Sequence, residues 1–328
     1  MPKNYAQLEL STQIVIAEAL KRGVKVEVLD EKDQFLRLSK GKHVEYVQEA
    51  TRTSKDSYIT GFILGNKLVT KKILDEHGVH VPKGKDYRDL KTAIQDYPKF
   101  SKGGWVVKPK TTNYGIGITI FKKAPSQKAF IQAVKIAFSH DSSILIEEFI
   151  EGIECRFLVI DYKTVAVLQR IPANVTGDGK HTIQQLVAIK NKDPRRGKGY
   201  KTPLEYIQIS AVEKQILKDQ KLTPQSIPKK GQQIFLRHNS NISTGGDSID
   251  YTDKVTYQYK KIAEQAAKAV SAKICGVDMM LQNFAQPVNK NNYAIIELNY
   301  NPVLYFHDFP YEGKNRHTGK YLLDVLGF

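Results

Sequence analysis

The stretch that decides the fold is Ile295-Ile-Glu-Leu-Asn-Tyr-Asn-Pro302, read together with the earlier Cys275-Gly-Val-Asp-Met-Met280. Both are short apolar runs that carry acidic or amide side chains, a pattern typical of strands. Alternate residues of a strand share a face, so Glu297 and Asn299 point one way. If the strand that carries Asp278 lies alongside, three oxygen-bearing side chains meet at one spot. The alternative is a polar strand face that only contacts water.

Oxygen ligands without Cys or His suit Mg²⁺ that is shared with the phosphates of a nucleotide. We therefore expect Asp278, Glu297 and Asn299 to bind Mg²⁺, with Mn²⁺ as an alternative. The histidines of the chain are scattered without metal-ligand spacing. No Ser-His-Asp or Cys-His arrangement with a recognisable local context supports covalent catalysis.

Length and composition indicate a globular protein of two or three lobes, with 328 residues of which 41% are hydrophobic. No apolar run is long enough to cross a bilayer, and the N-terminus lacks a signal-peptide core, so no membrane association is expected. The two cysteines, Cys155 and Cys275, lie in expected strands. They are interpreted as small core residues, which fits a reducing cytosol and a cytoplasmic location.

The charge of the chain is strongly basic, with 50 Lys and Arg against 34 Asp and Glu, a net +16. Nucleic acid, anionic small molecules and simple solubility would each suit this balance. The basic residues are dispersed and do not alternate with aromatic residues along a stripe, so nucleic acid is not an expected partner. Small anionic substrates are expected instead.

The order of the expected elements indicates a multi-lobed α+β chain. Helical periodicity over 11–22 is followed by an alternating strand at 24–29, and further helices are expected at 127–138 and 203–219. A polar, glycine-rich stretch at 190–202 is interpreted as a mobile loop.

A glycine-bearing loop follows the apolar strand Trp105-Val-Val-Lys-Pro. Glycines such as Gly115 and Gly117 allow backbone N–H groups to close on phosphate oxygens, and Lys108 would supply a point charge. A Gly-x-Gly alone is more often an ordinary turn, but a lysine and proline directly after a buried strand favour the phosphate interpretation.

The stretch Ser143-Ile-Leu-Ile-Glu-Glu-Phe-Ile-Glu-Gly-Ile-Glu154 is a hydrophobic strand that enters a short connection. Its backbone edge could pair with an adenine, and Glu154, seven residues after Glu147, could reach ribose hydroxyls. The alternative is an acidic surface cluster, which is the better interpretation of these residues taken alone.

The segment Leu236-Arg-His-Asn-Ser-Asn-Ile-Ser-Thr-Gly-Gly-Asp247 contains more small polar residues than an ordinary connection. Ser243, Thr244 and Gly245 offer hydroxyl and main-chain donors for a carboxylate or phosphate. Arg237 offers a forked guanidinium that can donate two hydrogen bonds to the same anion. Arg170 similarly precedes a turn. Both segments could instead be plain turns in a β-rich lobe.

Five stretches in this order resemble the ATP-grasp superfamily of carboxylate–amine ligases, and more narrowly the ATP-grasp portion of the bifunctional glutathione synthetases, with a relation to cyanophycin synthetase. They are Arg170-Ile-Pro-Ala-Asn-Val-Thr-Gly-Asp-Gly-Lys-His-Thr-Ile183, Pro194-Arg-Arg-Gly-Lys-Gly-Tyr200, Asn239-Ser-Asn-Ile-Ser-Thr-Gly-Gly-Asp-Ser-Ile-Asp-Tyr-Thr252, Cys275-Gly-Val-Asp278 and Glu297-Leu-Asn-Tyr-Asn-Pro302. The resemblance covers nearly the whole chain. It implies an α+β ATP-grasp fold, with a short N-terminal α/β domain at 1–66, a central lid subdomain at 67–155 and a C-terminal subdomain at 156–328.

The resemblance also implies roles for individual residues. Residues expected to contact ATP are Lys71, Lys108, Thr111, Gly115, Gly117, Glu147, Glu148, Ile150 and Glu154. Within this set the two lysines meet phosphates, the glycines lie in the lid loop, Glu147 lies at the adenine edge and Glu154 at the ribose. Residues expected to bind the other substrate are Arg156, Arg170, Asn241, Ser243, Thr244 and Gly245. Arg237, Lys108 and Arg170 are expected to act in catalysis, with Arg237 at the transferring phosphate.

The implied reaction is ATP-dependent amide formation through an acyl phosphate, with γ-glutamylcysteine and glycine as the expected substrates and glutathione as the product. Another short peptide or amino-acid pair is the alternative, and a catalytically silent nucleotide-binding module is the alternative of another class. Two expected departures from the family concern the substrate: the γ-glutamylcysteine-forming domain that precedes this module in the bifunctional enzymes is expected to be absent, and His238 stands where an acidic residue is expected. A separate glutamate–cysteine ligase as substrate supplier and a homodimer are both compatible with the sequence.

Overall fold

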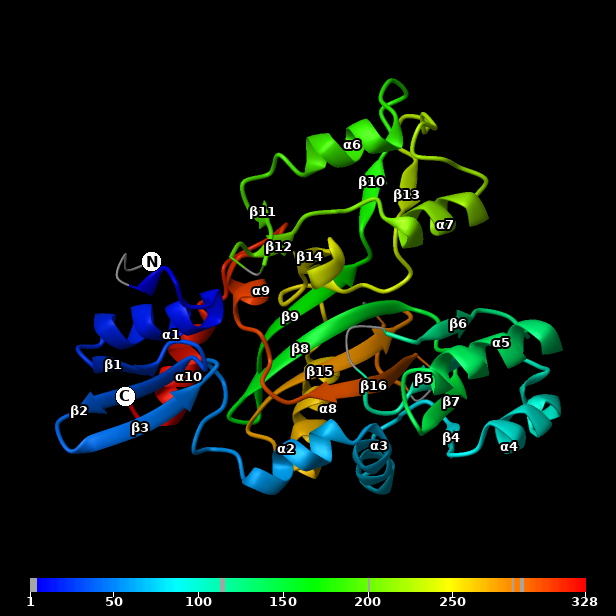
Figure 1. The fold of residues 1–328 in the computed structure, drawn as a ribbon. Coiled ribbons are helices and arrows are strands. Elements are labelled where there is room, and N and C mark those ends of the chain that lie inside the picture. The colour runs from blue at the N-terminus through cyan, green and yellow to red at the C-terminus, as the bar shows by residue number, and fades with distance from the viewer. Residues whose placement is uncertain (1–4, 113–115, 200, 285, 290–291) are drawn as a thin grey trace. The chain divides into compact units, whose positions relative to one another are not determined.

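The computed structural model describes residues 5–112, 116–199, 201–284, 286–289 and 292–328. The chain forms two compact units, each assembled from segments that are distant in sequence (Figure 1). Unit 1 comprises Met1–Lys55, Val165–Asp253 and Asn301–Phe328, and unit 2 comprises Asp56–Thr164 and Lys254–Tyr300. Helices and mostly antiparallel sheets confirm the α+β class. The division at residues 66 and 155 stays a prediction.

Unit 2 contains a four-stranded antiparallel sheet with the strand order β4-β7-β5-β6 (Figure 1). Phe130 of α5 and Ala93 of α4 form a buried core with Val107 and Ile146 of the sheet. Helix α5 begins where the Ser126 side chain accepts the Ala129 N–H at 3.3 Å. The elements of this part are β4 (Gly84–Tyr87), α4 (Leu90–Gln95), η2 (Tyr97–Phe100), β5 (Trp105–Pro109), β6 (Thr119–Phe121), α5 (Gln127–Phe138) and β7 (Ile144–Glu148).

The second sheet of unit 2 places β15 between two antiparallel neighbours, β8 and β16. β15 is an interior strand of this sheet, and seven of its eight residues are buried. The Asn66 side chain caps the N-terminus of α3. Thr70 and Leu74 form the buried face of that helix. The elements of this part are α2 (Tyr58–Gly65), α3 (Lys67–Glu76), β8 (Ile153–Ile160), α8 (Tyr257–Ala269), β15 (Ile274–Leu281) and β16 (Tyr293–Asn299).

Unit 1 joins the N-terminal, middle and C-terminal segments of the chain. Arg22, at the end of α1, donates to Asp324 of α10 at 2.7 Å and to the Phe328 carbonyl at 2.8 Å. The N-terminal elements are α1 (Leu10–Lys21), β1 (Lys25–Asp30), β2 (Phe35–Lys40) and β3 (His43–Gln48), and the three strands form one antiparallel sheet. The remaining elements are β9 (Lys163–Ile171), β10 (Asn174–Thr176), α6 (Ile183–Lys190), β11 (Arg196–Gly197), β12 (Leu204–Glu205), α7 (Ala211–Asp219), β13 (Gln233–Phe235), η3 (Ile242–Thr244), β14 (Asp247–Asp250), α9 (Tyr305–Asp308) and α10 (Thr318–Leu326).

The structure differs from the sequence expectation in two adjoining segments of unit 1. The helix expected over 203–219 begins only at α7, because Ser210 and Glu213 form a capping box there and residues 204–205 pair with β11 instead. The loop expected to be mobile over 190–202 is anchored at both Lys190 and Arg196. Lys190 donates to Asp247 at 2.6 Å, and the fully buried Arg196 side chain is ion-paired with the same carboxylate.

Candidate functional site

The two acidic stretches form neighbouring strands, as expected. Asp278 of β15 lies directly opposite Glu297 of β16, and opposing residues of antiparallel strands share a face. Asn299 is two residues further along β16, and its Nδ2 donates to Asp278 Oδ2 at 3.2 Å. The structure therefore brings the three predicted metal ligands together on one face of unit 2.

Arg156 completes this face from the other side of β15, because it lies opposite Asp278 on β8. Its guanidinium donates two hydrogen bonds to the Asp278 carboxylate, one from Nε and one from Nη2 at 2.8 Å. Burial by itself would lower the pKa of Arg156, but the Asp278 carboxylate outweighs it and raises that pKa. Arg156, predicted to bind substrate, therefore lies beside the acidic group.

The donor set of this face is compatible with a hard divalent cation. Asp278 and Glu297 supply carboxylate oxygens, Asn299 supplies an amide oxygen, and no soft ligand is present among the three. Asp278 is buried, whereas about a third of the Glu297 side chain is exposed. Glu297 is therefore the more accessible of the two carboxylates, while Asp278 is paired with Arg156. In the described part of the chain, no cluster of three or more His, Cys, Asp or Glu side chains could hold a metal ion, and this face itself has only two carboxylates beside the amide.

A second charged cluster of unit 2 joins two lysines through one buried carboxylate. Lys71 of α3 and Lys108 of β5 are both ion-paired with Glu147 of β7, which is 4% exposed. Burial and the nearby Lys108 charge together lower the pKa of Lys71 to about 8, while Glu147 opposes the change. The two lysines in turn outweigh the burial of Glu147 and hold the pKa of its carboxyl below the ordinary value.

The lysine pair carries more positive charge than Glu147 can neutralise when both lysines are protonated. The net positive charge of two ammonium groups beside one carboxylate favours the binding of an anion such as a phosphate group. The structure thus brings together the two lysines predicted for ATP phosphates. The side chain of Glu147 is occupied by these lysines, and its expected position at an adenine edge stays a prediction.

Lys67 is a candidate that the sequence analysis missed. Its Nζ lies 3.5 Å from Glu297 Oε1 and donates to the Thr112 carbonyl at 2.7 Å. Lys67 precedes Lys71 by four residues on α3, so both lysines lie on one face of that helix. The four-residue spacing of Lys67 and Lys71 was the only local sign in the sequence that Lys67 lies beside the predicted phosphate lysine. Its partners, however, come from β16 and from the residues after β5, which no local pattern of α3 predicts.

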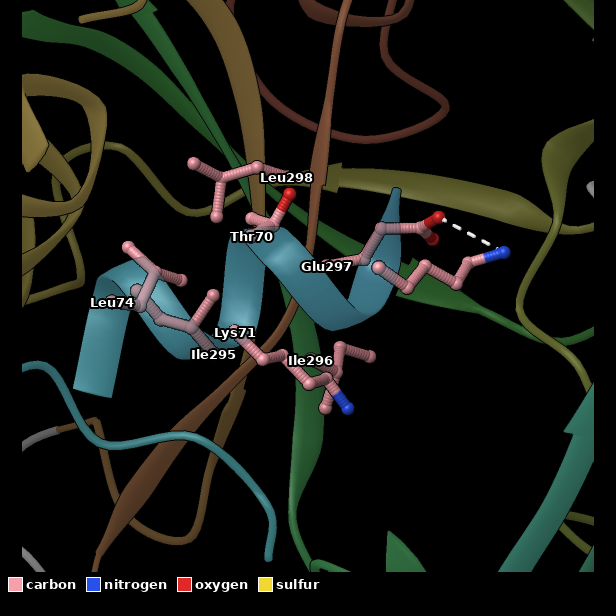
Figure 2. A pocket seen from close by; sticks show the side chains of 8 residues that line it. Thr70, Lys71, Leu74, Ile295, Ile296, Glu297 and Leu298 are labelled. Atoms are coloured by element: carbon pink, nitrogen blue, oxygen red, sulfur yellow. Dashed lines mark ion pairs between the residues drawn. The ribbon is translucent and has the colours of Figure 1, made fainter. Parts of the chain in front are cut away.

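Figure 2 shows the pocket where this face of α3 meets β16, with Thr70, Lys71 and Glu297 around it and the ion pair of Glu297 drawn. The enclosed volume is about 10 Å³, close to the room that a single water needs. The pocket is therefore a gap beside the charged cluster and too small for a nucleotide base.

The expected lid loop is described only in part, because Gly115 lies outside the described residues. Thr111 is anchored by Asp141, whose Oδ2 accepts its N–H at 2.7 Å and its hydroxyl at 2.8 Å. Gly117 has φ +73°, and a Cβ there would lie 2.7 Å from Pro109 Cγ. Both the positive φ and the close approach of Pro109 require glycine at this position.

The other predicted nucleotide contacts lie on or beside β7 and β8. Glu148 accepts the Lys83 N–H at 3.3 Å through its side chain, and Ile150 is half-buried in the connection between the two strands. Glu154 is half-buried on β8, opposite Met280 of β15. The roles of these residues toward ATP stay predictions.

The predicted substrate residues of unit 1 form a turn and its flanking strands. Arg170 of β9 lies opposite Ser248 of β14. Thr244 donates to the Asn241 carbonyl at 2.9 Å, and Gly245 follows η3 with φ +90°. Ser243 lies in η3, between these two contacts. The structure thus brings together Asn241, Ser243, Thr244 and Gly245 as one turn.

Comparison with known proteins places this chain and its fold in a class. Residues 64–180 match the sequence model of the ATP-grasp domain, and residues 6–59 match that of an ATP-grasp-like domain. The chain belongs to the ATP-grasp superfamily, and its fold is the ATP-grasp fold.

The particular relatives are bifunctional proteins of glutathione biosynthesis. The chain is 55% identical over 98% of its length to the glutathione biosynthesis bifunctional protein of Clostridium perfringens, covering 41% of that protein, and 48% identical over 98% of its length to that of Enterococcus faecalis, covering 42%. The crystal structure of a bifunctional glutathione synthetase from Pasteurella multocida matches with a TM-score of 0.78 and 44% identity, over 99% of this chain and 45% of that one. The chain thus spans about two fifths of the length of the curated relatives that it matches. None of the described helices is long and apolar enough to span a membrane.

Proposed function

We propose that this chain is an ATP-dependent carboxylate–amine ligase that joins γ-glutamylcysteine to glycine, giving glutathione, ADP and phosphate. The observation that carries the proposal is the alignment of Asp278, Glu297 and Asn299 on one face of β15 and β16. The buried pair of Lys71 and Lys108 beside Glu147 supports it, because the same unit then offers both a cation site and a phosphate site. The names of the relatives support glutathione synthesis as the particular reaction.

In this proposal Asp278, Glu297 and Asn299 hold Mg²⁺, or Mn²⁺ in its place. The cation would neutralise charge on the phosphates of ATP when bound. Lys71 and Lys108 would position those phosphates, so Glu147 would act on ATP through the lysines. This division of roles follows the geometry, in which both lysine ammonium groups already point at one buried carboxylate.

The reaction proceeds in two steps. A carboxylate oxygen of γ-glutamylcysteine attacks the γ-phosphorus of ATP, and the bond from that phosphorus to the bridging oxygen breaks to release ADP. The glycine amine then attacks the acyl carbon, phosphate leaves with the bonding electron pair, and the amine loses a proton. Arg237 would stabilise the charge on the transferred phosphoryl oxygens, and Arg170 with the turn 241–245 would hold the peptide substrate. The protein supplies position and charge and no nucleophile.

Trapping the acyl phosphate tests the proposal. With γ-glutamylcysteine and Mg²⁺–ATP, hydroxylamine should give a hydroxamate without glycine, and glycine should drive faster ADP release than D-alanine pairs or aspartate–arginine pairs. If a hydroxamate forms with some other carboxylate but not with γ-glutamylcysteine, the assignment as a ligase stands and the assignment to glutathione synthesis is wrong. Absence of ADP release with every substrate pair, despite nucleotide binding, would favour a silent nucleotide-binding module.

The source of the peptide substrate is part of the proposal. The curated relatives are bifunctional and extend well beyond the matched part. A glutamate–cysteine ligase, separate or joined to this chain, would supply γ-glutamylcysteine. Adding such an enzyme with glutamate and cysteine should replace added γ-glutamylcysteine in the assay. Sedimentation of the purified chain would test whether it forms a homodimer.

A further inference from the structure

Glu213 of α7 is a buried carboxylate that faces Arg237, the arginine proposed to meet the transferred phosphate. Its side chain is 2% exposed, whereas 22% of the Arg237 side chain is exposed. The ion pair is made by Arg237 Nε and Glu213 Oε1. Within the part of the chain that the structure describes, Arg237 has no second carboxylate partner.

The two oxygens of Glu213 serve different elements. Oε1 accepts from Arg237, while Oε2 accepts the Ser210 backbone N–H at 2.9 Å and the Ser210 hydroxyl. The second set of contacts is the capping box that begins α7. Because the cap holds one oxygen, the other oxygen is held in a defined position toward Arg237.

The backbone on both sides of this ion pair is fixed by packing. Leu236, directly before Arg237, is fully buried in the same core cluster as Leu217 of α7. The distance between α7 and the end of β13 is therefore set by apolar contacts. Glu213 then decides the direction of the Arg237 side chain, since a guanidinium held at Nε keeps its Nη1 and Nη2 edge for another anion.

We infer that Glu213 is a positioning residue for the ligase reaction, which orients Arg237 so that its Nη edge can meet an anionic phosphoryl or carboxylate group. This inference rests on the proposed function. Burial would raise the pKa of Glu213, but the contacts with Ser210 and Arg237 outweigh it and lower that pKa, so the carboxylate stays charged at neutral pH. A neutral side chain of the same shape would keep the cap but hold Arg237 poorly.

A double-mutant cycle of Glu213→Gln and Arg237→Ala tests the inference, with ADP release in the presence of γ-glutamylcysteine and glycine as the activity and thermal melting as the measure of stability. Glu213→Gln alone should lower kcat/KM for the peptide substrate by about tenfold to a hundredfold, the cost of a misplaced group, with KM for ATP unchanged. In the Arg237→Ala background the same change should cause no further loss. Equal losses of kcat/KM in both backgrounds would overturn the inference, because Glu213 would then act independently of Arg237.

Two further variants separate capping from positioning. Thr182→Ala removes the matching capping box of α6, which Thr182 forms with Gln185 and not with Arg237, and should lower stability without changing the kinetic constants. If Glu213→Gln does not fold, Glu213→Asp keeps the charge but shortens the reach and should show the same dependence on Arg237. Wild-type activity of Arg237→Ala would remove Arg237 from the proposed function. An impaired Arg237→Ala beside a fully active Glu213→Gln would overturn the inference alone.

Discussion

Replacing Glu147 by Gln should destabilise unit 2 strongly. Glu147 is buried and is the shared partner of Lys71 and Lys108, so the variant leaves two ammonium groups close together without the carboxylate that pairs with both. Removing one partner of a buried ion pair costs about 3–5 kcal/mol. Lys71 is only 13% exposed and Lys108 only 10%, so solvent relieves little of this cost.

The loss should depend on pH in a defined direction. The folded pKa of Lys71 is about 8, below the ordinary value of 10.5, so between these two pH values the unfolded chain binds more protons and stability rises with pH. Without Glu147 the folded pKa falls further, and the rise begins at a lower pH. The difference between variant and wild type is therefore largest below the lowered Lys71 pKa of the variant, shrinks as the pH rises from there to about 8, and stays constant above about 8.

Tryptophan fluorescence during urea unfolding measures this locally. The single tryptophan, Trp105, lies on β5 opposite Glu148 and in the same sheet as Glu147 and Lys108. Its signal reports the four-stranded sheet, which matters because a chain of two units need not unfold in one step. The exposed Glu151 provides the control, since Glu151→Gln should change the free energy of unfolding by no more than about 0.5 kcal/mol. A Glu147→Gln midpoint within error of that control at pH 7 would refute the reasoning.

Three further predictions concern the candidate site of unit 2. Asp278→Asn and Glu297→Gln should each abolish Mg²⁺-dependent ADP release, and the melting temperature should stay close to wild type for Glu297→Gln, because about a third of the Glu297 side chain is exposed; turnover like wild type in either variant would contradict the metal assignment. If Lys71 must be charged to hold phosphate, KM for ATP should rise as pH increases through about 8, whereas Lys71→Arg, which stays protonated, should give a flat profile. Asp141→Asn should speed amide exchange at Thr111, whose N–H and hydroxyl both bond that carboxylate, and unchanged exchange would show that the anchor is not formed in solution.

Local patterns determined much of this protein. The helix expected over 127–138 is found with those bounds as α5, because an amphipathic stripe and the Ser126 cap are both local signals. The alternation at 295–299 correctly placed Glu297 and Asn299 on one face, since residues two apart in a strand share a side. The ordered set of motifs also indicated the ATP-grasp class, which the comparisons confirm.

Tertiary structure alone decided which charges meet. Nothing near Asp278 in sequence predicts that Arg156, more than a hundred residues earlier, grips its carboxylate, because strand pairing brings β8 beside β15. The same holds for Glu147, interpreted as a surface acid from its neighbours but buried between lysines from α3 and β5. Residues 190–202 are polar enough to suggest a mobile loop, yet Asp247 holds Lys190 and Arg196. Hydrophobic periodicity shows which residues share a face of one helix or strand. The pairing of buried charges depends instead on which strands lie side by side and in what register, and no local pattern in the sequence shows this.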